Sequence, residues 1–160
     1  MCIPNLCKKE PIPKKLPLEM ESEVKKLKKI KSKLAVLKEA YKFVSGNFGK
    51  YCKIYLNLLK LPRLYKKDVS SIWDYKYSDD PFLHCTQLNY LIRVLLIKSK
   101  KFKEKDIGLV NIFQWPPFIH QYLIIKIDKK FIDVDVWYSK LGIAFGKHEP
   151  VLLYLGKPIF

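Results

Sequence analysis

The chain has 160 residues, 49% of them hydrophobic and 14% aromatic, which is more apolar side chain than a disordered chain carries. No run approaches the ~18 apolar residues of a membrane span, and the start of the chain lacks the apolar core of a secretory signal, so we expect a cytoplasmic protein that does not bind membranes. The net charge of +16 is uneven, because residues 1–67 carry 18 basic and 5 acidic side chains.

This basic N-terminal half predicts at most a weak contact with an acidic partner. Arg63 and Arg93 are the only arginines in the chain. Arginine is the residue favoured for bidentate recognition of phosphates and bases. We therefore do not expect specific nucleic-acid binding, and lysines that solvate outer helix faces explain most of the charge.

The sequence predicts neither a metal site nor a cofactor. Its cysteines are Cys2, Cys7, Cys52 and Cys85. No two of them have the Cys-x-x-Cys spacing of a zinc or redox site, and no nearby histidine completes one. We expect these few, irregularly spaced cysteines to be reduced.

In chain order, residues 1–18 read as an extended arm rich in proline and lysine, and residues 19–160 as a single domain. The domain is predicted to begin with one helix from Glu19 to about Ser45. Its apolar positions recur every three or four residues and form a single stripe, which we expect to pack on the chain's own core rather than in a coiled coil. They are Val24, Leu27, Ile30, Leu34, Leu37, Tyr41 and Val44.

A second short helix is predicted for Tyr51 to Leu61, before Pro62, and then a loop with one turn around Val69–Trp73. The segment from Cys85 to Lys98 has apolar residues at helical spacing. Four runs of β-branched and aromatic residues then have the length of strands. They are Leu109–Phe113, Ile119–Ile127, Phe131–Tyr138 and Val151–Leu155. Helices followed by antiparallel strands predict an α+β domain.

Three side chains are candidates for catalysis: Cys85, His120 and Asp135. Cys85 begins an apolar helix, where unpaired N–H groups and the helix dipole favour a thiolate. His120 lies at the start of a strand. Asp135 lies inside an apolar run, where a carboxylate needs a partner. A nucleophile, a base and a group that orients the base are what covalent catalysis requires.

Strand register distinguishes Asp135 from Asp133. If the hairpin turns on Asp128-Lys129, Ile127 faces Lys130 and Asp135 lies opposite Tyr122. Asp135 is then one diagonal step from His120, a Cα separation of about 7–8 Å that side chains bridge. Asp133 lies opposite Ile124, two steps away, so we expect Asp135 to be the partner of His120.

The segment from His84 to Trp137 resembles the core of the transglutaminase-like superfamily, in three motifs. The first, Cys85-Thr86-Gln87-Leu88-Asn89-Tyr90-Leu91-Ile92-Arg93-Val94-Leu95-Leu96, is similar to the family's cysteine at the start of a helix. The second, His120-Gln121-Tyr122, stands where the family has His-Ala-Trp. The third, Phe131-Ile132-Asp133-Val134-Asp135, stands where the family's strand ends in Asp-Pro; here Val136 replaces the proline.

The resemblance implies a papain-like core, with N-terminal helices packed on an antiparallel sheet, and acyl transfer through a cysteine thioester. Cys85 would attack an amide of a protein or peptide, His120 would transfer protons and Asp135 would hold the imidazole. The acceptor would be water or an amine. The Cys85 N–H would be one oxyanion donor, and Trp73, Gln87 and Trp115 are candidates for the second.

Two alternatives accompany this interpretation. Cys85-Thr86-Gln87-Leu88-Asn89 is also similar to the Cys-x-Glu-x-Asn stretch of arylamine N-acetyltransferases, although their Arg-Gly-Gly is absent and their extra domains exceed 160 residues. The other alternative is a binding module on the transglutaminase fold. Its triad would be silent, and its basic N-terminal half would dock an acidic partner.

Overall fold

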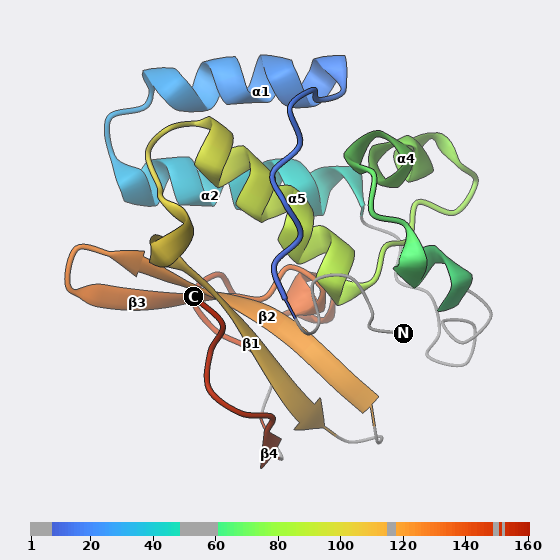
Figure 1. Ribbon diagram of the computed structural model, residues 1–160, viewed down its shortest axis with the longest axis vertical. Coiled ribbons are helices and arrows are strands. Elements are labelled where there is room, and N and C mark those ends of the chain that lie inside the picture. Colours follow the sequence, from blue (N-terminus) through green and yellow to red (C-terminus); the bar gives the residue numbers. More distant parts are fainter. Residues whose placement is uncertain (1–7, 49–60, 115–117, 149–150, 152) are drawn as a thin grey trace.

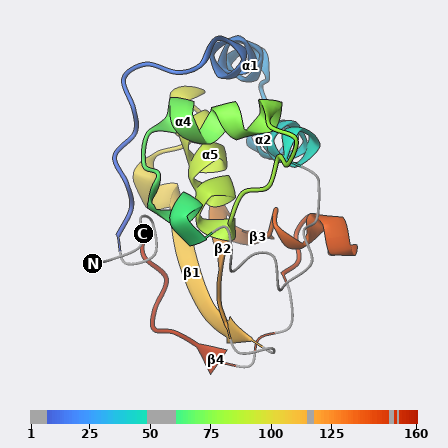
Figure 2. The ribbon, with the colours of Figure 1, turned by 90° about the vertical axis from the view of Figure 1, so that its right-hand side faces the viewer.

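The computed structural model describes residues 8–48, 61–114, 118–148, 151 and 153–160. The predicted α+β class is confirmed. Four α-helices and a four-stranded antiparallel sheet make up the described part. The helices α1 (Leu18–Lys29), α2 (Lys33–Asn47) and α5 (Cys85–Lys98) stack above the sheet (Figures 1 and 2). No helix within the described ranges combines the length and the hydropathy that crossing a membrane requires.

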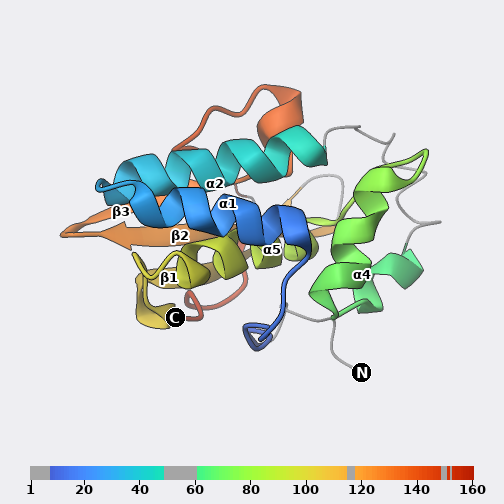
Figure 3. The ribbon, with the colours of Figure 1, turned by 90° about the horizontal axis from the view of Figure 1, so that it is seen from above.

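The first predicted helix is in fact two helices, so that prediction was wrong. The helix α1 spans Leu18–Lys29 and α2 spans Lys33–Asn47. Between them Ile30 is extended, and the Ser32 hydroxyl accepts a hydrogen bond from the Ala35 N–H at 3.3 Å. A serine cap of this kind starts a new helix, and the two helices lie side by side (Figure 3).

The break changes which residues of the apolar stripe are buried. Leu27 of α1 and Leu37 of α2 have no exposed surface, whereas Leu34, in the first turn of α2, is 38% exposed. Ile30 is only partly buried. The stripe was continuous in the sequence, but the turn at residues 30–32 rotates its middle section away from the core.

The helix α5 spans Cys85–Lys98, as predicted, and is the central helix of the core. The short helix α4, Val69–Trp73, lies where a turn was expected. It is preceded by a 3-10 turn η1, Leu61–Tyr65, and followed by another, η2, Asp74–Tyr77. Residues 51–60 of the helix predicted for Tyr51 to Leu61 lie outside the described residues.

The strands are β1 (Ile107–Gln114), β2 (Phe118–Ile127), β3 (Lys130–Val134) and β4 (Leu153–Tyr154), in the sheet order β3-β2-β1-β4. A short 3-10 turn η3, Glu104–Asp106, leads from α5 into β1. The predicted hairpin register is confirmed, because Ile127 pairs with Lys130 and Ile124 with Asp133. Asp128 takes a positive φ of 56° in the turn, a conformation that aspartate tolerates.

The third strand is shorter than predicted. It ends at Val134 rather than at Tyr138, which instead begins a 3-10 turn η4, Tyr138–Leu141. The reason is local, since the Asp135 Oδ1 accepts a hydrogen bond from the Tyr138 N–H at 3.3 Å and Gly142 ends the turn at a φ of 89°. Aspartate favours such side-chain-to-backbone bonds over a strand ladder.

Residues 8–17 of the arm lie along α5. Three side chains of that helix donate hydrogen bonds to arm carbonyls: Tyr90 to Pro11 O at 2.9 Å, Lys98 to Lys14 O at 3.1 Å, and Arg93 to Glu10 O. Ile12 and Leu16 pack against the core. The arm is therefore fastened to the helix that begins at Cys85.

Candidate active site

The structure brings Cys85, His120 and Asp135 together from three elements. Cys85 is the first residue of α5 and is partly exposed. His120 lies near the start of β2 and is 1% exposed, and Asp135 follows the end of β3 and is 2% exposed. The three residues are far apart in sequence but converge where β3 leaves the sheet.

The His120–Asp135 pair is buried and short. The His120 Nε2 lies 2.8 Å from the Asp135 Oδ2. The imidazole also makes a hydrogen bond with the Cys85 side chain, and because Nε2 is taken by Asp135, the other ring nitrogen, Nδ1, is left for the sulfur. The imidazole of His120 thus lies between the Cys85 sulfur and the Asp135 carboxylate.

The site favours a protonated His120. Burial alone would lower the pKa of His120, but its hydrogen bonds to Asp135 and Cys85, with the negative charge on both, raise that pKa to about 10. An imidazolium beside a sulfur favours the thiolate, which is the nucleophilic form of cysteine. The arrangement therefore suits nucleophilic attack by Cys85 followed by proton donation from His120.

Aromatic side chains of η4 and the residue before it pack against the imidazole. The Tyr138 ring meets His120 edge-on with centroids 4.9 Å apart, and the Trp137 ring lies at 5.9 Å. The Tyr138 N–H also holds the second oxygen of Asp135. Tyr138 is not among the predicted site residues, because the sequence predicts it at the end of a strand. The sequence signal for a turn here was Asp135, three residues before Tyr138, together with Gly142 after the turn.

Asn89 fixes α5 against the sheet one turn after Cys85. Its Nδ2 donates to the Gln121 carbonyl at 2.8 Å, and the Gln121 Nε2 donates to the Asn111 Oδ1 at 2.9 Å. Asn89 and Gln121 are each 1% exposed. Buried polar groups that are hydrogen-bonded in this way fix the position of a helix relative to the strands. Asn89 therefore fixes the position of Cys85 along the sheet, next to His120.

Two of the three candidate oxyanion side chains donate hydrogen bonds to other groups in this structure. The Trp73 Nε1 donates to the Glu19 Oε2 at 3.0 Å, and the Gln87 Nε2 donates to the Arg63 carbonyl at 2.8 Å. Trp115 lies outside the described residues. The sequence identifies these two side chains as possible donors, but it does not report that a carboxylate and a carbonyl accept their hydrogen bonds.

Backbone donors remain at the start of α5. The His84 carbonyl accepts from the N–H groups of Gln87 and Leu88 at 3.0 and 3.1 Å. The N–H groups of Cys85 and Thr86 precede the first intrahelical bond, as at any helix start. They lie beside the sulfur and are the local donors that an oxyanion would meet.

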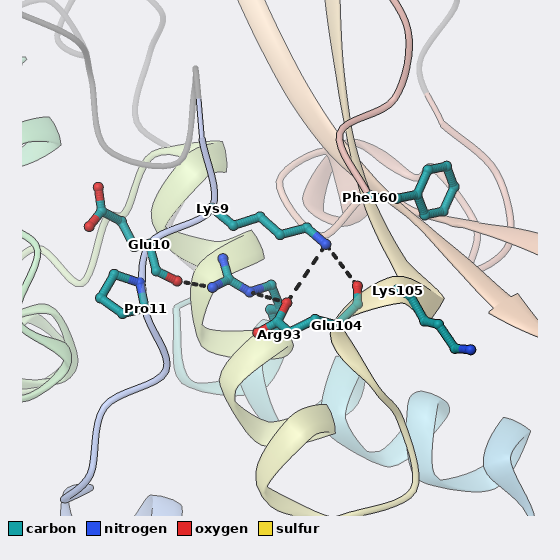
Figure 4. Close-up of a pocket in the computed structure, with 7 residues that line it drawn as sticks. All are labelled: Lys9, Glu10, Pro11, Arg93, Glu104, Lys105 and Phe160. Carbon is teal, nitrogen blue, oxygen red and sulfur yellow. Dashed lines mark hydrogen bonds and ion pairs between the residues drawn. The ribbon is translucent and has the colours of Figure 1, made fainter.

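A separate pocket of about 480 Å³ lies between the arm, α5 and η3 (Figure 4). Its charged side chains form ion pairs with one another, because the Glu104 Oε2 lies 3.7 Å from the Lys9 Nζ and 3.3 Å from the Arg93 Nε. Arg93 also donates a hydrogen bond to the Glu10 carbonyl of the arm. Arg93 lies eight residues beyond Cys85, about 12 Å along the helix. The pocket therefore belongs to the anchoring of the arm rather than to the triad.

Comparisons of the chain with protein-family models, with curated proteins and with solved structures found no match.

Proposed function

We propose that this protein is a thiol-dependent acyl-transfer enzyme with a papain-like, transglutaminase-like core and a Cys85-His120-Asp135 triad. The observation that carries the proposal is the buried His120–Asp135 pair, at 2.8 Å, with the imidazole also hydrogen-bonded to Cys85 at a helix start. Burying an ionisable pair is costly, and a catalytic role accounts for its position beside the sulfur.

The proposed reaction has two steps, the acylation of Cys85 and its deacylation, and His120 donates a proton in the first step and accepts one in the second. The Cys85 sulfur attacks the carbonyl carbon of a peptide or protein amide, and the N–H groups at the start of α5 stabilise the oxyanion. The C–N bond then breaks, and the His120 imidazolium gives its proton to the leaving amine. Water or a second amine then attacks the thioester carbonyl and loses a proton to the neutral His120 imidazole. The C–S bond breaks, the acyl product leaves, and the Cys85 thiolate and the His120 imidazolium are restored.

The test is the selective modification of Cys85. We expect iodoacetamide to alkylate Cys85 faster than Cys2, Cys7 or Cys52 at about pH 6, where ordinary thiols are protonated. With p-nitrophenyl acetate, we expect a burst of p-nitrophenolate and an acetyl group on Cys85, identified by peptide mass spectrometry. His120→Ala should abolish both results. A Cys85 that reacts no faster than the other three cysteines would refute the proposal.

The basic surface favours a second candidate, a binding module for an acidic partner. Exposed lysines line α1 and the start of the following turn: Lys25, Lys26, Lys28, Lys29 and Lys31. Such a surface gives sequence-independent binding that weakens steeply with salt. Heparin binding that falls with salt, combined with an inert Cys85, would support this second function in place of the first.

A further inference from the structure

We propose that the pocket between the arm, α5 and η3 binds a single nucleotide, with the phosphate among its cationic side chains and the flat base against Phe160. The pocket is here called the arm pocket, and its volume of about 480 Å³ falls in the range of about 300–1,000 Å³ of small-molecule sites (Figure 4). The triad does not line it, so the inference is independent of the proposed function. Its lining includes Lys9 and Pro11 of the arm, Arg93 of α5, Glu104 and Lys105 of η3, and Phe160.

Two buried cations of the arm pocket share one carboxylate. The side chain of Lys9 is 13% exposed and that of Arg93 is 1% exposed, and both form their ion pair with Glu104. The other carboxylate of the lining, that of Glu10, turns to the far side of the arm in Figure 4 and lies 4.0 Å from the Lys67 Nζ. The two cations therefore face less negative charge than the positive charge they carry.

Glu104 does not compensate either cation fully for its loss of water. Burial lowers the pKa of Lys9, Glu104 raises it and Arg93 lowers it again, so that the pKa stays below its ordinary value of 10.5. Burial also holds the pKa of Arg93 below its ordinary value, although Glu104 raises it. A further anion in the pocket would favour the charged form of both side chains, so the site is suited to an anionic ligand.

Two lysines have donors left for that anion. The Lys9 ammonium carries three N–H groups, and both acceptors that it has among the described residues belong to Glu104, the carbonyl at 2.8 Å and the carboxylate. The Lys105 ammonium has no partner in the described part of the chain, and its flexible side chain extends outward in Figure 4, from where it can turn over the pocket. A phosphate has up to two negative charges and three acceptor oxygens, so it suits two ammonium groups.

Phe160 supplies an aromatic wall beside these charges. Its ring is held on the sheet at Gly108, because a Cβ at that glycine would lie 3.0 Å from the ring carbons Cε1 and Cζ. The Phe131 ring also meets it edge-on, with centroids 6.1 Å apart. Phe160 is nevertheless 50% exposed. An aromatic ring that is fixed in place and still accessible binds a flat base by stacking, which is worth about fivefold or more in affinity.

A nucleotide in the arm pocket would also fasten the arm, because Lys9 belongs to the arm whereas Lys105 and Phe160 belong to the domain. A ligand that binds only the docked arm lowers the population of the open arm by a factor of 1 plus the ratio of ligand concentration to dissociation constant. At an AMP concentration of ten times the dissociation constant, we therefore expect tryptic cleavage after Lys14 and Lys15 to slow by about tenfold.

The experiment is isothermal titration calorimetry of the full chain with AMP, adenosine and inorganic phosphate. We expect AMP to bind about tenfold or more tightly than adenosine or phosphate, because only AMP contacts both the lysines and the ring. Phe160→Leu should weaken AMP by about fivefold or more and leave inorganic phosphate unchanged. Lys105→Gln should weaken AMP and phosphate alike, each severalfold.

Lys103→Gln is the matched control, because Lys103 is an exposed lysine two residues before Lys105 that does not line the arm pocket. It removes the same charge from a chain of net charge +16 and should bind AMP as the original chain does. Absent AMP binding would overturn the proposal, and so would tryptic cleavage after Lys14 and Lys15 that saturating AMP does not slow. Equal losses in Lys103→Gln and Lys105→Gln would also overturn it, since they would indicate a general attraction of anions to the basic surface. None of these results bears on Cys85.

Discussion

Asp135 and Asp133 are two residues apart in the chain, and the structure gives them different partners. Asp135 binds His120 at 2.8 Å, whereas the Asp133 Oδ2 lies 3.9 Å from the His148 Nε2 and its residue pairs with Ile124. We expect Asp135→Ala to slow the alkylation of Cys85 strongly and Asp133→Ala to change it little. The double variant His120→Ala, Asp135→Ala should be hardly worse than either single variant, because a triad acts as a unit.

The measurement is the iodoacetamide rate at Cys85 in the four variants at about pH 6, with circular dichroism as a check on folding. The interpretation of the hairpin fails if Asp133→Ala is the damaging change. It also fails if the effects of His120→Ala and Asp135→Ala multiply, which would mean that the two residues act independently.

The raised pKa of His120 makes a prediction about stability. Its ordinary value is 6.5, and in the folded chain it is about 10, because the bonds to Asp135 and Cys85 outweigh burial. A folded-state pKa above the unfolded one contributes stability that is complete below about pH 6.5 and lost as the pH rises through about 10. We therefore expect the free energy of unfolding to fall between these two pH values.

Urea titrations followed by tryptophan fluorescence across that range measure the effect. Asp135→Asn removes the carboxylate that favours the imidazolium, so this variant should lose less stability over the same interval. Other groups that titrate at alkaline pH are common to both chains. If the free energy of unfolding falls equally with pH in the original chain and in Asp135→Asn, His120 is not held in its charged form.

At the scale of elements, sequence periodicity predicted α5 and the β2–β3 hairpin well and α1–α2 badly. Both ends of the helix Cys85–Lys98 were predicted correctly, because its apolar residues recur at helical spacing along the whole segment. The break at Ser32 was missed because the apolar spacing continues across it, and periodicity does not report a cap. The strand predicted to reach Tyr138 stopped at Val134 because a local Asp135–Tyr138 bond outweighed β propensity.

The break in the first predicted helix changes the expected cost of core substitutions. Leu37 has no exposed surface and belongs to the main core, whereas Leu34 is 38% exposed. Leu37→Ala should therefore lower the free energy of unfolding by about 2–5 kcal/mol, and Leu34→Ala by about 0.5 kcal/mol or less. Both lie in α2, so helix propensity is matched, and urea denaturation distinguishes them. Equal losses would indicate that α1 and α2 form the single helix after all.

At the scale of the whole molecule, the convergence of Cys85, His120 and Asp135 could be predicted from the sequence, and the surroundings of these residues could not. Residue type, helix start, hairpin register and the resemblance to the transglutaminase-like core together selected the three residues. The partners of Trp73 and Gln87 depend on which loops pack beside them, Glu19 in α1 and Arg63 in η1, and no local pattern reports such contacts.

The sequence predicts an extended arm for residues 1–18, and the structure shows that its residues 8–17 dock on α5. Arg93 is 1% exposed, binds the Glu10 carbonyl and pairs with Glu104 in η3, so one side chain ties together the arm, α5 and the segment that leads into the sheet. Few apolar contacts support an arm of this kind, so it should open locally without global unfolding. The bond from Lys14 to Lys15 then becomes a trypsin site.

We expect Arg93→Met, which keeps much of the apolar stem, to speed tryptic cleavage after Lys14 and Lys15 severalfold, because the carbonyl of Glu10 loses its buried donor. Tyr90→Phe removes only the hydroxyl that holds the Pro11 carbonyl, and should produce a smaller change in the same direction. Cleavage timed by mass spectrometry under native conditions gives both rates, and the midpoint of urea unfolding shows whether the domain itself is affected. If the arm packs on a domain that is stable without it, the rate of tryptic cleavage increases severalfold while the midpoint of urea unfolding changes little. A midpoint that falls in step with cleavage would mean that the arm is part of the core, and that α5 does not hold its place beside the sheet without it.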